Sequence, residues 1–473
     1  MKRRHFLLLL VFICLVILFR FYNLPQTTRF TRDESSNLRD MKRIWVTRDI
    51  TLIGPIDANM TIIYPSLTFY MLMPFAVLGK FEPQSPAYGT AFFGLLIVFL
   101  ILFLTKKLNK KLLPFVAALS VVWFPLIESS RWAWNPHLVA FTSIIAILLY
   151  FRKDKISFIF SGVFFGLSFH LHYLTFFSFA AFILLVGLKS LRQKKFLVPI
   201  LIFLGFFLMI VPFIYFDWKN PPGLFFNHFW KNNLIRSHGA PDMLNFIRSF
   251  SVNIYQSLFY LSQNMLLAIF LGFILVWLTI KDLIHKSQSL LFLIPVVPQI
   301  AIISFLPTFE NRYFLLGLSF FITWLIYPRG KKEGSLVKFA VLIMILGSLG
   351  QLKNQLTKPI REPAAGTVSL VSNYIRDKVN KDDRKNVNVA VLASPDADPL
   401  GVVYRHTLQV KGINLLLENQ FDITDNLFVV STSDEDKVRK DPANVMGGFR
   451  KGPLADTYKL ANSEWRVYLF NRY

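Results

Sequence analysis

The acidic pair Asp33-Glu34 is the stretch of this 473-residue chain whose residue types best fit chemistry. It lies in a polar segment, residues 20–61, that directly follows the first apolar run. A carboxylate in such a place can act as a general base that takes the proton of a hydroxyl group as its oxygen attacks. Two adjacent carboxylates can also divide the work, one as the base and one as its orienter or as a weak cation ligand. The alternatives are a solvated acidic pair in a loop or the amino-terminal turn of a helix, where Asp and Glu are favoured.

A second candidate is the run Arg131-Trp132-Ala133-Trp134-Asn135. An arginine near the membrane interface suits a phosphate group, which a guanidinium binds through two parallel hydrogen bonds. Arg131 and Asn135 are four residues apart, so on one helix they would share a face. The alternative is an aromatic belt, in which Trp and Arg anchor the end of a helix at the interface.

Further candidates are polar residues at the ends of later apolar segments. His170 and His172 alternate, and in a helix two such side chains diverge by about 200°. A contact with sugar or phosphate is therefore favoured over a metal site, and histidines buried in a helix bundle are the alternative. Arg312 could supply a cation for a phosphate leaving group, with Glu310 beside it, or could extend its charge to the interface with that partner. Arg236 lies in a long polar loop that could cover a substrate cavity as a lid.

The composition indicates that membrane helices must position these candidate residues. The chain is 54% hydrophobic with 50 Phe and a mean hydropathy of +0.46, values typical of a polytopic membrane protein. The net charge of +24 comes largely from short basic loops between apolar segments. This is the positive-inside pattern of membrane proteins, whereas a nucleic-acid-binding protein would carry its basic residues on one face of a folded domain. The single cysteine, Cys14, excludes a disulfide framework within the chain.

The basic loops also predict the topology. With the amino terminus and every basic loop in the cytoplasm, residues 62–79 must begin and end outside, as a re-entrant or juxtamembrane element. Pro65 and Pro74 within it fit that interpretation. The sequence thus predicts an all-α polytopic protein with about eleven transmembrane helices, formed by residues 1–350. Residues 355–473 are predicted to form a small extracytoplasmic α/β domain, and the plasma membrane is the expected location.

Several short motifs resemble a known superfamily. They are Tyr64-Pro65 before a short apolar element, Ser130-Arg131 with Asn135, and Arg312-Tyr313 at the start of a span. Together with the early Asp-Glu pair, they resemble the C-type-fold glycosyltransferases that use polyprenyl-phosphate sugars. The branch is that of the protein O-mannosyltransferases and the aminoarabinose transferase of lipid A. The resemblance covers roughly residues 1–350.

This resemblance implies a GT-C-like fold and inverting transfer of a sugar from a polyprenyl-phosphate lipid to an acceptor hydroxyl or phosphate at the outer membrane face. It maps the catalytic carboxylate onto Asp33, with Glu34 as its neighbour, and Tyr64 onto the substrate-binding residues. The sequence departs from the family pattern at Ser66, where a second proline is usual, and at Asn135, where an aspartate is usual. The sequence identifies no certain cofactor, and it leaves open whether the protein binds a divalent cation.

Two other classes of function compete with a transferase. The first is a transporter or flippase of lipid-linked or small anionic molecules, but transporters typically show internal repeats and charges near the membrane midplane. The second is a non-catalytic assembly subunit whose terminal domain binds partners. The partners expected of a transferase are the polyprenyl-phosphate sugar, the membrane and an acceptor glycan, lipid or protein, with no nucleic acid.

Overall fold

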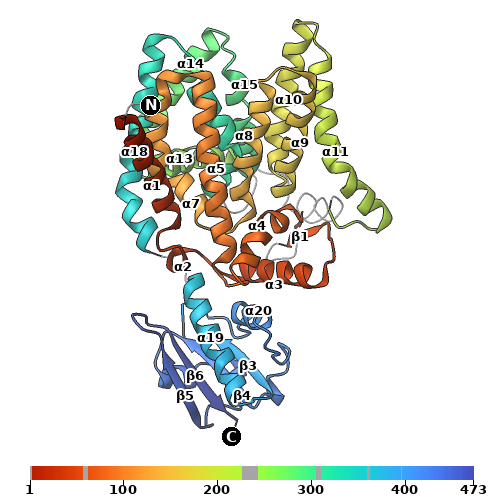
Figure 1. Cartoon of the computed structure of the whole chain (residues 1–473), viewed down its shortest axis with the longest axis vertical. Coiled ribbons are helices and arrows are strands. Elements are labelled where there is room, and N and C mark those ends of the chain that lie inside the picture. Colours follow the sequence, from red (N-terminus) through yellow and green to blue (C-terminus); the bar gives the residue numbers. More distant parts are fainter. Residues whose placement is uncertain are drawn as a thin grey trace. The chain divides into compact units, whose positions relative to one another are not determined.

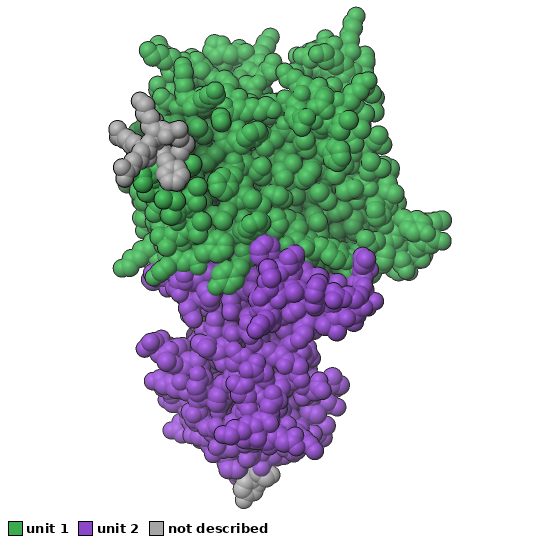
Figure 2. All heavy atoms as spheres, viewed as in Figure 1, with its two compact units in different colours: residues 1–22, 51–71, 88–356 green, residues 23–50, 72–87, 357–473 purple. Residues whose placement is uncertain are grey.

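The computed structural model describes residues 3–56, 62–225, 243–304, 311–358, 363–395 and 397–472. They form two compact units, drawn in different colours in Figure 2. Unit 1 comprises residues 1–22, 51–71 and 88–356, and unit 2 comprises residues 23–50, 72–87 and 357–473. Two early segments, 23–50 and 72–87, therefore cluster with the C-terminal residues and not with the rest of the predicted membrane domain.

Unit 1 is a helical bundle with one small hairpin (Figure 1). Its chain is apolar almost without interruption, and helices that are apolar on all sides belong in a protein core or a bilayer. In chain order its elements are α1 (Arg3–Phe21), β1 (Ile53–Ile56), β2 (Ile63–Pro65), α4 (Leu67–Leu78, shared with unit 2), α5 (Ser85–Leu108), η1 (Lys110–Leu112), α6 (Leu113–Val122), α7 (Phe124–Ser130), η2 (Asn135–Leu138), α8 (Val139–Tyr150), α9 (Lys155–Leu171), α10 (Thr175–Arg192), α11 (Leu197–Lys219), α13 (Met243–Ser262), α14 (Met265–Ile284), α15 (Leu290–Leu293), α16 (Val296–Ile303), η4 (Asn311–Gly317), α17 (Leu318–Ile326) and α18 (Lys331–Thr357).

The protein is a multi-pass membrane protein. Among the described residues five helices, α5, α10, α11, α14 and α18, are long and apolar enough to cross a bilayer. A sixth span is possible where residues 110–122 and 124–130 form one segment bent by 48°. Helix α11 exposes Phe203, Leu204, Phe207 and Leu208, side chains that lipid solvates and water does not. The expected count of about eleven spans stays a prediction, because the other apolar helices are shorter.

The predicted re-entrant element, residues 62–79, begins as a strand. Strand β2 pairs with β1 in antiparallel register, and α4 follows with Pro74 inside it. With 12 residues α4 is about 18 Å long, short of the roughly 30 Å of a bilayer core. Whether this element re-enters the membrane stays a prediction.

A close approach of two backbones fixes how α9 and α11 pack in unit 1. Helices α9 and α11 cross where Gly162 faces Ile202 and Gly205 faces Ile159. A β-carbon built on Gly162 would lie 1.9 Å from the Ile202 carbonyl oxygen, and one on Gly205 would lie 2.0 Å from that of Ile159. Only glycine permits this crossing, the small-residue packing by which membrane helices associate.

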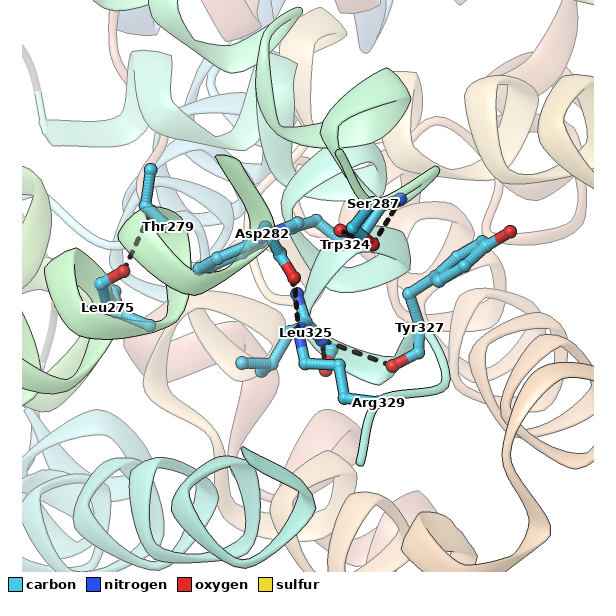
Figure 3. Close-up of polar contacts among 9 residues, drawn as sticks. Leu275, Thr279, Asp282, Ser287, Trp324, Leu325, Tyr327 and Arg329 are labelled. Carbon is cyan, nitrogen blue, oxygen red and sulfur yellow. Dashed lines mark hydrogen bonds and ion pairs between the residues drawn. The ribbon is translucent and has the colours of Figure 1, made fainter. Parts of the chain in front are cut away.

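A buried ion pair ties α14 to the segment that follows α17. The Asp282 carboxylate accepts hydrogen bonds from the Arg329 Nη2 and the Trp324 indole N–H, both at 2.8 Å (Figure 3). Both charged side chains are almost fully buried. A buried charge needs such a partner, so the pair holds two chain segments in one arrangement.

Unit 2 joins early helices to an α/β fold. Its sheet has the order β3-β4-β6-β5, with β3 and β4 parallel and the other pairs antiparallel. The sequence of this region predicts strands at 387–393, 427–430 and 465–470 and helices at 366–379 and 399–407. The structure has an element at each of these places, and it adds β5 and α21, which the sequence does not predict. Its elements are α2 (Leu24–Thr27), α3 (Arg32–Thr47), α19 (Ala365–Lys381), β3 (Val387–Val391), α20 (Val402–Val410), η5 (Phe421–Ile423), β4 (Asn426–Ser431), α21 (Glu435–Arg439), η6 (Asn444–Met446), β5 (Leu454–Lys459) and β6 (Arg466–Asn471).

Candidate functional site

The acidic pair lies in the first turn of a helix, not in a loop. Helix α3 runs from Arg32 to Thr47, whereas the sequence of residues 38–46 by itself predicts only a short amphipathic helix on the membrane surface. The missed signal is Thr31-x-x-Glu34, the capping-box pattern that starts a helix. Because Asp33 lies at the amino-terminal end of α3, the helix dipole favours its charged form.

Glu34 has a structural task in this arrangement. Its Oε2 accepts hydrogen bonds from the Thr31 backbone N–H at 2.6 Å and from the Thr31 hydroxyl at 2.7 Å. The Arg29 guanidinium lies 3.8 Å from its other oxygen. Glu34 as a whole is only 4% exposed, while Asp33 is half-buried. The two neighbouring carboxylates therefore differ: Glu34 closes the helix end, and Asp33 is the one with access to solvent.

Behind Asp33, α3 buries a face against α20. The buried residues Ser35, Leu38, Met41 and Ile44 follow helical spacing along this face. Burial also raises the pKa of Asp40 above its ordinary value, and the nearby Arg39 and Arg43 oppose that shift. The remaining surface of α3 carries the charged residues.

A second group of candidate residues forms an aromatic cluster in unit 1. The Tyr64 ring packs against His172 and Tyr173, with centroids 5.4 and 5.2 Å apart. Tyr313 continues the cluster, 5.6 Å from His172 and 6.1 Å from Trp134. A cluster of rings of this kind offers flat apolar faces and hydroxyl groups that can hold a sugar.

The protonation of His172 follows from its contacts. Its Nδ1 accepts the Leu174 backbone N–H at 3.3 Å, so in the neutral ring the proton sits on Nε2. The Nε2 lies 3.3 Å from the Tyr64 hydroxyl oxygen and donates to it. The hydrogen bond joins the Tyr64 hydroxyl group to the His172 ring.

His170 points elsewhere. Its Nε2 lies 2.8 Å from the Met209 carbonyl oxygen, and its ring meets Phe213 edge-on at 4.7 Å. The two histidines do not share a helix: His170 is in the last turn of α9, while His172 follows its end with an extended backbone. No group of three His, Cys, Asp or Glu residues that could hold a metal ion occurs in the described parts of the chain.

The expectation that Arg131 and Asn135 share one helical face is wrong. Helix α7 ends at Ser130 and η2 begins at Asn135, because the chain turns between them. The Arg131 guanidinium donates to the carbonyl oxygens of Phe19 at 3.0 Å and Tyr22 at 2.8 Å, at the end of α1. Arg131 is only 2% exposed, so these hydrogen bonds indicate that it fixes the end of α1.

Asn135 connects two of the helices around the aromatic cluster. Its Nδ2 donates to the Leu171 carbonyl oxygen at 2.6 Å, at the end of α9 and directly before His172. The structure thus brings Tyr64, Asn135 and His172 together. A buried arginine that the sequence argument overlooked, Arg20, donates to the Ser120 carbonyl oxygen at 3.0 Å.

Three predicted residues cannot be placed with the others. Arg236 and Glu310 lie outside the described residues. Arg312 belongs to η4 by its backbone, but its side chain also lies outside what is described. The placed candidates fall into two groups, Asp33 and Glu34 in unit 2 and the remainder in unit 1.

Helices that cross the membrane, followed by a terminal α/β fold, are features of the GT-C fold of membrane glycosyltransferases. The chain has this fold over nearly its whole length. It is similar to the crystal structure of ArnT from Cupriavidus metallidurans in the apo state, an aminoarabinose transferase, with a TM-score of 0.56 and 11% identity. That match covers 98% of this chain and 97% of the other.

A second crystal structure, ArnT from Cupriavidus metallidurans bound to undecaprenyl phosphate, matches equally well. Its TM-score is 0.55 at 12% identity, with the same coverage of both chains. Neither a known protein family nor a curated protein matches the chain by sequence. The likeness is therefore one of fold, and it confirms the predicted GT-C-like fold.

Proposed function

We propose that the protein is an inverting glycosyltransferase that moves a sugar from a polyprenyl-phosphate-linked donor to an acceptor hydroxyl or phosphate. The observation that carries this proposal is the end-to-end likeness to a structure that holds undecaprenyl phosphate. A lipid-borne donor also fits a chain in which no glycine-rich nucleotide loop is present. The enzyme would work at the outer face of the plasma membrane.

In this reaction Asp33 is the general base. An acceptor oxygen attacks the anomeric carbon while the bond from that carbon to the lipid phosphate oxygen breaks. The acceptor proton passes to Asp33, and the polyprenyl phosphate leaves with the bonding electrons. Attack from the side opposite the leaving group inverts the anomeric centre. A positioned base contributes about 10²–10⁴-fold to such a step.

The other candidates divide into sugar and phosphate contacts. Tyr64 and His172 would hold the sugar, with Asn135 fixing the helix end that carries His172. Arg236 and Arg312 would neutralise the phosphate, with Glu310 orienting Arg312. Arg131, whose guanidinium donates to the carbonyl oxygens at the end of α1, would position that helix. His170, bound to the Met209 carbonyl, would serve the packing of α9 on α11.

A reconstituted assay separates this proposal from its rivals. The purified protein in liposomes is given a radiolabelled polyprenyl-phosphate sugar together with a lipid acceptor. A transferase forms labelled product, a flippase moves the label across the bilayer without product, and an assembly subunit does neither. Movement without product would overturn the proposal.

The predicted orientation can be tested with single cysteines. In a Cys14→Ser background, Lys106→Cys tests a basic loop and Lys385→Cys tests unit 2. A membrane-impermeant maleimide applied to intact cells should label the cysteine at 385 and not the one at 106. Labelling at 106 would contradict the orientation.

A further inference from the structure

Helix α20 lies between the C-terminal sheet and the helix that carries Asp33. Both α3 and α20 belong to unit 2, and α3 packs along α20. Two neighbouring residues of α20, Arg405 and His406, have buried side chains that bind different partners. The arrangement links the sheet to the first turn of α3 through a short chain of contacts.

On the sheet side, Arg405 fixes α20. Its guanidinium donates to the Asn388 side-chain oxygen on β3 and to the Leu416 carbonyl oxygen. Its Nε also lies 3.4 Å from the Leu400 carbonyl oxygen. Arg405 is 4% exposed and Asn388 is fully buried. Several hydrogen bonds from one planar side chain hold a helix in a defined orientation.

On the other side, His406 holds α3. Its Nδ1 lies 3.1 Å from the Ser35 hydroxyl oxygen, two residues after Asp33, and the two side chains are 8% and 1% exposed. The Ser35 hydroxyl donates its single hydrogen to the Arg32 carbonyl oxygen at 2.9 Å. His406 must then donate from Nδ1, as a neutral ring can.

The surroundings of His406 keep it neutral. Burial, together with the charges of Arg39, Arg32 and Arg405, lowers the pKa of His406 to about 4. The first two arginines lie on α3 and the third on α20. At neutral pH the ring is therefore an uncharged donor to Ser35.

Other contacts attach the C-terminal residues to the chain around α3. The Lys42 ammonium donates to the Val410 carbonyl oxygen at the end of α20. The Ala365 N–H donates to the Thr28 carbonyl oxygen at 3.1 Å, just before α3 begins. In the turn after α4, Glu82 accepts from Lys411 and from a serine of α19, both at 2.5 Å.

We propose that residues 363–472 act as a template that positions the Asp33 helix, and that His406 is the positioning residue through which they hold its first turn. This rests on the proposed function, in which Asp33 is the base. A base must meet its proton in a narrow range of geometries, and a displacement of about 1 Å can reduce the rate about 100-fold. Residues 363–472 would thereby influence the rate of transfer without contacting the substrate.

The test compares full-length variants reconstituted in liposomes. His406→Ala and Ser35→Ala should each lower kcat roughly tenfold and leave the KM for the lipid donor unchanged, because the bond between them is lost. The double variant should be no slower than the slower single one, since both remove the same contact. His406→Asn, whose amide N–H can replace Nδ1–H, should restore most of the rate.

A matched control lies in the same domain. Tyr374→Phe removes the hydrogen bond that the Tyr374 hydroxyl donates to Asp456 at 3.0 Å, far along the chain from α20, and should leave kcat unchanged. Hydrogen exchange gives a readout that needs no activity. Amides in the first turn of α3 should exchange faster in His406→Ala and at the wild-type rate in Tyr374→Phe.

The outcomes separate this inference from the function on which it rests. Wild-type kcat and wild-type exchange in His406→Ala would overturn the template, as would an equal loss of kcat in Tyr374→Phe. A fully active Asp33→Asn variant would instead overturn the base, while the exchange rates would still decide whether His406 holds α3.

Discussion

Replacing Glu34 separates the roles of the two adjacent carboxylates. Both hydrogen bonds from Thr31 end on the same Glu34 oxygen, at 2.6 and 2.7 Å. In Glu34→Gln the amide oxygen can take that place, while the negative charge and its attraction to Arg29 are lost. In Glu34→Ala both bonds disappear and the Thr31 N–H is left without its partner.

The expected size of the effect follows from these contacts. Two hydrogen bonds to a buried acceptor at about 1–1.5 kcal/mol each give a loss of about 2–3 kcal/mol in Glu34→Ala. Glu34→Gln should lose about 1 kcal/mol or less. If Glu34 only closes the helix end, Glu34→Gln keeps kcat within about threefold of the wild type, well short of the loss that removing a base brings.

The measurement pairs a transfer assay with thermal unfolding of the same preparations. A 100-fold loss of kcat in Glu34→Gln at an unchanged melting temperature would refute this reasoning, because the amide preserves the cap and removes only the acid–base function. Full stability of Glu34→Ala would refute the capping role itself.

Three further outcomes test the packing and charges around the site. Gly162→Ala should unfold the bundle at lower temperature, since its β-carbon would meet a carbonyl oxygen at 1.9 Å, whereas Gly187→Ala, with nothing within 4 Å, should melt like the wild type. Asp282→Asn should reduce the free energy of unfolding by about 3–5 kcal/mol, because Arg329 keeps a buried charge without its counter-ion. Replacing both members by apolar residues should restore part of the loss, as seen in melting temperatures. The pKa of His406 is about 4 in the folded protein and 6.5 in the unfolded chain. Between pH 6.5 and 4 the unfolded chain therefore binds a proton at His406 that the folded protein does not bind. Stability should therefore fall as the pH drops from 6.5 to 4, by up to roughly 3 kcal/mol, and His406→Asn should flatten this dependence in melts at several pH values.

The membrane fold could be predicted because its signals are local and strong. Long apolar runs predict helices directly, and the alternation of strand and helix after residue 363 follows from short apolar runs between turn residues. Strand β5 was missed because only alternate residues of Leu454–Lys459 are partly buried, at the edge of the sheet. A weakly apolar edge strand has little to distinguish it from a loop.

The candidate site could be predicted only in part. The types of its residues were informative, but their directions depend on where the chain turns. The helix assumed through Arg131 and Asn135 is broken by a turn, so the two side chains reach α1 and α9 instead. The contact between His406 and Ser35 joins residues 371 positions apart, and no local sequence pattern predicts it.

The central claim is that Asp33 is the base of a sugar transfer, and one comparison tests it most directly. Asp33→Asn and the control Asp40→Asn, on the same helix, are assayed in liposomes with a radiolabelled polyprenyl-phosphate sugar. We expect at least about a 100-fold loss of transfer in Asp33→Asn, with normal insertion and an unchanged melting temperature, and a wild-type rate in Asp40→Asn. Transfer at the wild-type rate by Asp33→Asn would contradict it.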